Sequence, residues 1–146
     1  MKSIQKITRV QLKASHKDDF ILFGIVSAEP DYKLSLTLNQ NFKISLRNIS
    51  PVKIANSNGE EFSFSRFSHS SGPKYSTFNL ISNRTDTNIL IKKLKNIDYI
   101  FQIQDADMET DITSFAAKLR NIETITAVFI IDMSIIKDKN FHYLIE

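Results

Sequence analysis

The stretch Phe20-Ile21-Leu22-Phe23-Gly24-Ile25-Val26, residues 20–26, decides the fold. It is a short apolar run, and the polar residues 16–19 in front of it supply a turn. Such a run is typical of a strand that is buried on both faces in the middle of a sheet, and its Phe and Ile content favours a strand over a helix. The sequence therefore predicts a central strand here.

Further strands are indicated on both sides of this segment. Val10, Leu12 and Ala14 alternate with polar residues, which predicts a strand with one buried face. Residues 61–67 and 75–82 predict a hairpin, because the connecting residues 68–73 have turn chemistry. Residues 56–59 predict another turn, and residues 83–96 a polar connection. The strands expected beside the central one cover residues 6–14, 42–46, 52–54, 61–67, 75–82, 97–104 and 125–131.

The clearest helix is predicted over residues 109–121. Glu109 and Asp111 lie at its start, where negative charge is favourable. Five apolar residues recur at helical spacing and form one stripe that would lie on a sheet, namely Ile112, Phe115, Ala116, Leu119 and Ile122.

Residues 29–40 allow two interpretations. Tyr32, Leu34, Leu36 and Leu38 alternate with polar residues, which predicts a strand. A helix is the alternative, because Ser27 can cap it and residues 29–31 suit a first turn. With a helix here, the element order β-β-α-β-β-β-β-β-α-β predicts an α+β fold: a mostly antiparallel sheet of about six to eight strands with two helices packed on one face.

Composition limits the class of protein. The chain has 146 residues, 42% of them hydrophobic, with no Cys and only three Gly. One domain over residues 1–146 is expected. Without Cys there is no thiolate metal site and no Cys nucleophile, and the three scattered Gly cannot build a P-loop or a dinucleotide fingerprint. No apolar run approaches the roughly 20 residues of a membrane-spanning helix. A cytoplasmic protein without a cofactor is therefore expected.

The formal charge of +3 is spread as a mosaic. Residues 1–17 are basic, whereas residues 98–111 are acidic. A strong nucleic-acid binder usually has a concentrated basic face instead. Basic residues beside the aromatic-rich hairpin could still contact RNA, although Phe62 and Phe64 share one face and suit a core better than base stacking. The candidate contacts are Arg66, Lys74, Arg84, Lys92, Lys93 and Lys95.

Acidic and histidine side chains give weak metal signals. Asp105, Asp107, Glu109 and Asp111 alternate, but the spacing does not match a calcium loop, so the structural role of favouring a helix start is preferred over a loose divalent-ion site. The three His are expected on the surface, with a metal or general-base role considered only for His69. No Ser lies in a nucleophile elbow, and no catalytic residue is assigned.

Residues 91–99 contain Ile91, Ile97, Asp98 and Tyr99. Their spacing resembles the motif of the bacterial IPExxxVDY family, in which Ile91, Asp98 and Tyr99 match and Ile97 replaces the Val. Lys92 and Lys93 stand where the family has Pro and Glu, so an acid or base role of that Glu cannot carry over. The resemblance implies a helix over residues 29–40, and it implies no activity. Independently of it, Asp98 at a strand start can bond backbone amides while the Tyr99 ring packs into the sheet.

Function is predicted mainly by exclusion. We expect a non-catalytic module that binds a protein partner or self-associates through its sheet. The alternative is RNA or ribosome association through the basic residues named above. A small-molecule sensor or an unrecognised hydrolase is a weaker alternative.

Overall fold

The computed structural model describes residues 20–70, 76–86, 88–104 and 111–132, together with positions 134, 138, 140 and 143. The main sheet has six strands in the order β2-β3-β4-β7-β1-β8, and every neighbouring pair is antiparallel. The expected α+β class is confirmed. The strands are β1 (Ile21–Ser27), β2 (Arg47–Ala55), β3 (Glu61–Ser70), β4 (Thr77–Ser82), β7 (Tyr99–Gln104) and β8 (Ile125–Ile130).

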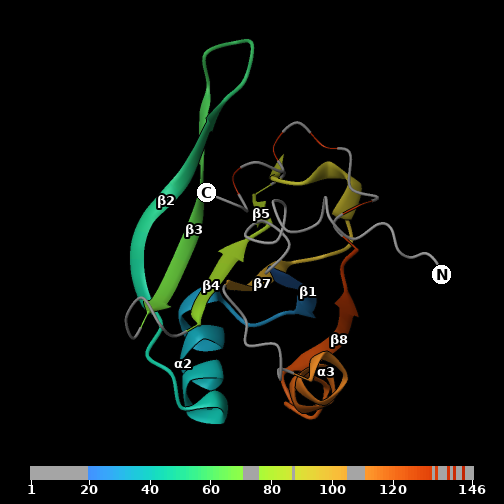
Figure 1. Ribbon diagram of the computed structural model, residues 1–146. Helices are drawn as coiled ribbons and strands as arrows, with labels where there is room; N and C mark the ends of the chain where they lie inside the picture. Colours follow the sequence, from blue (N-terminus) through green and yellow to red (C-terminus); the bar gives the residue numbers. More distant parts are fainter. Residues whose placement is uncertain are drawn as a thin grey trace, which may run out of the picture.

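The remaining elements lie on the two faces of this sheet. The helices α2 (Asp31–Phe42) and α3 (Ile112–Arg120) are on one side of it in Figure 1. On the other side are a small sheet of β5 (Arg84–Thr85) and β6 (Asn88–Ile89) and the 3₁₀ helix η2 (Lys92–Leu94). The β2–β3 hairpin extends beyond the rest of the sheet (Figure 1).

Both predicted helices pack on the same face. Phe23 and Ile25 of β1 belong to the hydrophobic cluster that also contains helix residues, as the period of two in a strand requires. The rings of Phe42 in α2 and Phe115 in α3 stack with centroids 4.4 Å apart, so the helices also touch one another. Helix residues in this cluster are Leu34, Leu38, Phe42, Phe115, Ala116 and Leu119.

The opposite face carries a second cluster. Leu22 of β1 and Ile100 of β7 point into it, and residues 90–97 cover them. β1 and β7 are therefore buried on both faces. This burial confirms the central strand predicted over residues 20–26. The strand predicted over residues 97–104 begins at Tyr99, and it is more deeply buried than its alternation of apolar and polar residues indicates. Phe64 is also buried here and Phe62 is partly buried, as a core role requires.

Helix α2 resolves the ambiguity of residues 29–40. Leu34 and Leu38, four residues apart, are buried, whereas Tyr32 and Leu36 are more than half exposed. Alternating apolar residues thus fall on two sides of a helix. Lys43 ends it in the left-handed conformation, with its N–H bonded to the Asn39 carbonyl. The strand predicted over residues 42–46 is wrong, because the helix ends at Phe42 and the side-chain oxygen of Asn39 accepts a hydrogen bond from the Leu46 N–H.

Several other boundaries differ from the predictions. Residues 52–54 belong to the nine-residue β2, whose register shifts between Ile49 and Val52 at Pro51. Residues 68–70 extend β3 instead of forming a turn. The segment 83–96, expected as a plain connection, contains β5, β6 and η2. The turn at residues 56–59 is confirmed, with Gly59 at φ +84°. The strand predicted over residues 6–14 lies outside the described residues.

The helix predicted over residues 109–121 corresponds to α3, which begins at Ile112 with Asp111 as its N-cap. Residues 109 and 110 lie outside the described part of the chain. Over the ranges that the structure describes, no helix has the length and apolar character needed to cross a membrane.

Candidate functional site

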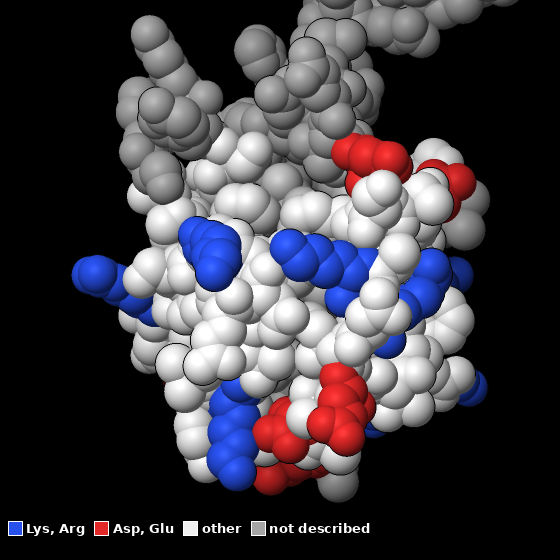
Figure 2. Space-filling view, turned by 90° about the horizontal axis from the view of Figure 1, so that it is seen from below, with Lys and Arg blue, Asp and Glu red and all other residues white. Residues whose placement is uncertain are grey.

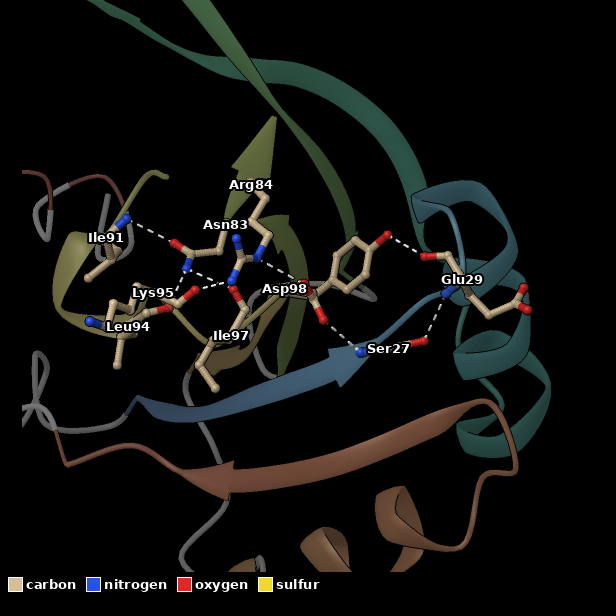
Figure 3. A network of polar contacts seen from close by, with 10 residues as sticks. Ser27, Glu29, Asn83, Arg84, Ile91, Leu94, Lys95, Ile97 and Asp98 are labelled. Atoms are coloured by element: carbon tan, nitrogen blue, oxygen red, sulfur yellow. Dashed lines mark hydrogen bonds and ion pairs between the residues drawn. The ribbon is translucent and has the colours of Figure 1, made fainter. Parts of the chain in front are cut away.

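The motif residue Asp98 lies in a polar network at the start of β7 (Figure 3), and Tyr99, the first residue of β7, donates a hydrogen bond to Glu29. One carboxylate oxygen of Asp98 accepts the Ser27 N–H at 3.0 Å, and the other forms an ion pair with Nε of Arg84 at 3.0 Å. The Asp98 N–H donates to the Ile25 carbonyl. Arg84 also donates to the carbonyl of Lys95. Asp98 therefore joins the end of β1 to the segment that follows β4.

Asn83 is the second centre of this network. Its side chain is fully buried, its amide nitrogen donates to the carbonyls of Leu94 and Ile97 at 2.9 Å each, and its amide oxygen accepts the Ile91 N–H at 2.8 Å. Its backbone bonds Asp98 and Leu90. One asparagine thus holds both ends of residues 90–97 against the sheet, as Figure 3 shows.

Tyr99 points to the helix face. Its hydroxyl donates to the Glu29 carbonyl at 2.5 Å, and its ring belongs to the cluster shared with the helices. Burial, followed by the nearby charges of Asp31, Asp98 and Glu29, raises the pKa of Tyr99 to about 12. The phenol is therefore a neutral hydrogen-bond donor at physiological pH.

The chemistry of this network is structural. Both oxygens of Asp98, the amide of Asn83 and the hydroxyl of Tyr99 are each engaged by a neighbouring part of the fold. A polar group held in this way stabilises a unique arrangement of the backbone. Asn83 brings together the backbone of the motif residues Ile91, Ile97 and Asp98 and so positions the segment 83–97, whereas Tyr99 packs on the opposite, helix face.

The basic residues proposed as RNA contacts are only partly gathered. Lys92, Lys93 and Lys95 are exposed on one short segment, while Arg84 is held on Asp98. Arg66 in β3 donates to the Ser50 carbonyl at 3.1 Å. Lys74 lies outside the described residues. On the helix side of the molecule, Figure 2 shows basic side chains separated by uncharged surface and accompanied by acidic groups.

The acidic and histidine candidates take structural positions where they are described. Asp111 accepts the Ser114 N–H at 3.1 Å and the Ser114 hydroxyl at 2.8 Å, and these bonds lower its pKa. Asp105, Asp107 and Glu109 lie outside the described residues. His69 Nδ1 accepts the Ser45 N–H. Within the described ranges, no three His, Asp or Glu side chains are placed to share a metal ion.

An open apolar groove, which the sequence patterns do not predict, lies beside strand β8. Its volume is about 370 Å³. One wall comes from η2 and the residues that follow it, and the other from the end of β8. Phe129 and Ile130 are about half exposed there, at 52% and 49%. The lining residues are Lys93, Leu94, Lys95, Asn96, Ile97, Phe129, Ile130, Ile131 and Asp132.

Within the part of the chain that the structure describes, strand β8 is an edge of the sheet and pairs on one side with β1. The Ile131 N–H donates to the Leu22 carbonyl at 2.9 Å, so backbone groups of residues 129 and 131 face β1, whereas those of Val128 and Ile130 face outward. Arg120 of α3 donates to the outward Val128 carbonyl at 3.0 Å. The N–H and C=O of Ile130 and the N–H of Val128 remain directed away from the sheet.

The two sheet edges differ in chemistry. The β2 edge has Pro51, a register shift, and the charged residues Arg47 and Lys53, all of which oppose pairing with another strand. Strand β8 reads Ile-Thr-Ala-Val-Phe-Ile and has neither charge nor proline. Of the two edges that the described strands form, the end of β8 beside the groove is therefore the one whose chemistry suits an added strand.

The sequence carries a partial signal for this site. Residues 125–131 form an apolar run, which predicts a buried strand. Ile125 and Val128 are indeed buried, but Phe129 and Ile130 are not. The run is only partly buried because β8 lies at an edge of the described sheet, and this position depends on the strand order.

No protein-family model matches the chain, and none of the curated proteins compared with it does. The resemblance to the IPExxxVDY family therefore stays a prediction that depends on the motif residues.

Proposed function

We propose that this protein is a non-catalytic, cytoplasmic interaction module that binds an extended segment of a protein partner by adding it as a strand to β8. The observation that carries the proposal is the uncharged, outward-facing edge at Val128 and Ile130, next to an apolar groove. In strand addition the backbone hydrogen bonds supply affinity, while pockets for alternate side chains supply specificity. Both parts of such a site are present here.

The groove adds the specificity element. Its walls are the apolar side chains of Leu94, Ile97, Phe129 and Ile131, and the network of Asn83 and Asp98 holds the wall that η2 forms. A strand laid along Ile130 would direct every second side chain toward this groove. Among the motif residues, Ile97 thus lines the groove itself, while Asp98 supports the wall from behind.

Substitution Ile130→Pro tests the proposal. Because the Ile130 N–H faces outward, proline removes one hydrogen bond to an added strand and leaves the β1–β8 bonds in place. We would screen a combinatorial library of capped hexapeptides against the ¹⁵N-labelled protein by NMR. The expected result is a set of peptides that shift the amides of Val128 and Ile130 and slow their hydrogen exchange, with at least a tenfold loss of affinity in Ile130→Pro.

The matched control is Ile130→Thr, which keeps the N–H and suits a strand. It should bind within about threefold of the wild type. Peptides that bind Ile130→Pro and wild type equally would contradict strand addition.

RNA or ribosome association is the second proposal. The observation in its favour is the exposure of Lys92, Lys93 and Lys95 on one segment. A steep loss of RNA affinity with salt, together with NMR shifts limited to these lysines, would support it over strand addition.

A further inference from the structure

We infer that the segment received by β8 is an acidic one, with glutamate or aspartate side chains between apolar ones. This inference rests on the proposed function and names the chemistry of its partner. It is carried by the charges that border the β8 edge.

Basic side chains border the edge on both of its faces. Lys93 and Lys95 line the groove side and are exposed. Arg120 reaches the edge from α3 on the helix side, where its guanidinium contacts the Val128 carbonyl. Among the described residues, neither lysine forms an ion pair, and the single ion pair is that of Arg84 with Asp98.

One acidic residue, Asp132, also lines the groove. Its carboxylate accepts the Ser134 N–H at 3.0 Å and the Ser134 hydroxyl at 2.7 Å, and these bonds lower its pKa. The Asp132 carboxylate thus forms hydrogen bonds within its own turn, whereas Lys93 and Lys95 form no ion pair with any described residue. A partner that approaches the groove meets an excess of positive charge.

The size of the groove fits side chains better than a folded surface. A volume of about 370 Å³ lies at the lower end of the roughly 300–1,000 Å³ of ligand pockets. The lining between the lysines is apolar, so it suits aliphatic side chains of an extended segment. A strand that alternates its side chains would place acidic groups against the lysines on one face or against Arg120 on the other.

A second copy of this chain fits the site less well. Its β8 carries no acidic residue to meet Lys93, Lys95 or Arg120. Charge complementarity therefore favours an acidic partner.

The test uses three capped peptides and the full chain. The peptides are Val-Val-Glu-Glu-Val-Val and its variants with Gln-Gln or Lys-Lys in the middle, which place one central residue on each face of an added strand. We expect the Glu peptide to bind about five- to tenfold more tightly than the Gln peptide at 50 mM salt, the order of two exposed ion pairs. This preference should fall below about threefold at 500 mM salt.

Paired variants locate the charge effect. The double substitution Lys93→Gln and Lys95→Gln should lower affinity for the Glu peptide and leave the Gln peptide unchanged. The control substitutions Lys33→Gln and Lys53→Gln, at exposed positions on α2 and β2, should change neither.

The outcomes separate the two levels of the proposal. If the Gln and Lys peptides bind as tightly as the Glu peptide and shift the Val128 and Ile130 amides, the acidic partner is wrong and strand addition stands. If none of the three peptides shifts these amides and the library screen also fails, the proposed function is wrong. Self-association that Ile130→Pro abolishes, with no preference for the Glu peptide, would identify a second copy as the occupant and overturn the acidic partner.

Discussion

Asn83→Ala should destabilise the protein strongly, because a single side chain closes three hydrogen bonds inside the fold. Asn83 is fully buried and bonds the Ile91 N–H and the carbonyls of Leu94 and Ile97. The Leu94 carbonyl also accepts the Ile97 N–H and would keep a partner. All three groups would lose the asparagine, and among the described residues two of them, the Ile91 N–H and the Ile97 carbonyl, have no second hydrogen bond.

The magnitude follows from these two groups. A buried polar group without a partner costs about 1–3 kcal/mol, and the missing side chain leaves a small cavity in addition. We expect the free energy of unfolding to fall by about 3–4 kcal/mol, a large part of the ~5–15 kcal/mol that is typical of a domain. Urea unfolding followed by far-UV circular dichroism measures the change, since the chain has no Trp.

Two comparisons make this prediction decisive. Asn48→Ala, at an exposed position on β2, should cost less than about 0.5 kcal/mol. Asn83→Asp keeps the side-chain size but places an oxygen where the amide donates, so it should be at least as damaging as Asn83→Ala at pH 7. A loss for Asn83→Ala within about 1 kcal/mol of that for Asn48→Ala would refute the role of Asn83, and so would a stable Asn83→Asp.

Three further predictions concern Gly24, Tyr99 and Arg120. A Cβ at Gly24 would lie 2.8 Å from Cδ1 of Ile97, so Gly24→Ala should lower the free energy of unfolding by about 1–2 kcal/mol. Ile97→Val removes that atom and should recover part of the loss in a double-mutant cycle. Additive effects of the two substitutions would contradict the contact. The pKa of Tyr99 is raised to about 12, so the neutral phenol stabilises the fold fully below its unfolded pKa of ~10, and this contribution is lost as the pH rises through 12. Between pH 9 and 12, the free energy of unfolding of the wild type should therefore fall by about 1 kcal/mol more than that of Tyr99→Phe, a value reduced for solvent screening. Parallel pH profiles of the two proteins would contradict this prediction. Arg120→Ala removes the hydrogen bond to the outward Val128 carbonyl and should increase self-association, as measured by sedimentation velocity, whereas Lys118→Ala on the same helix should not. Equal self-association of the two variants would show that Arg120 does not protect the edge.

Local patterns were sufficient for the elements in which burial follows chain periodicity. The apolar run around Phe23 predicts a strand covered on both faces, because strand geometry sets this pattern. The stripe of α3 predicts its buried side except at Ile112, which is 38% exposed. The same reasoning was less successful for α2, where apolar residues two apart also fit a helix whose Tyr32 and Leu36 remain exposed. There the expected helix depended on a family resemblance.

The candidate site required more than periodicity. Asp98 and Tyr99 stand out in the sequence, but their partners Ser27, Glu29 and Arg84 are distant in the chain, and Asn83 carried no signal of its own. Such contacts form only when β1, β4 and β7 become neighbours. The groove beside β8 likewise combines residues near position 95 with residues near position 130.

The amino-acid sequence by itself determined the central strand and most of the apolar face of α3, since both follow from the local spacing of apolar side chains. Only the tertiary structure decided that β8 is an edge strand and that Lys93, Lys95 and Arg120 border it. The physical reason is that strand order depends on pairing between distant segments. An apolar strand reads the same in sequence whether a neighbour covers its outer hydrogen-bonding groups or leaves them open to a partner.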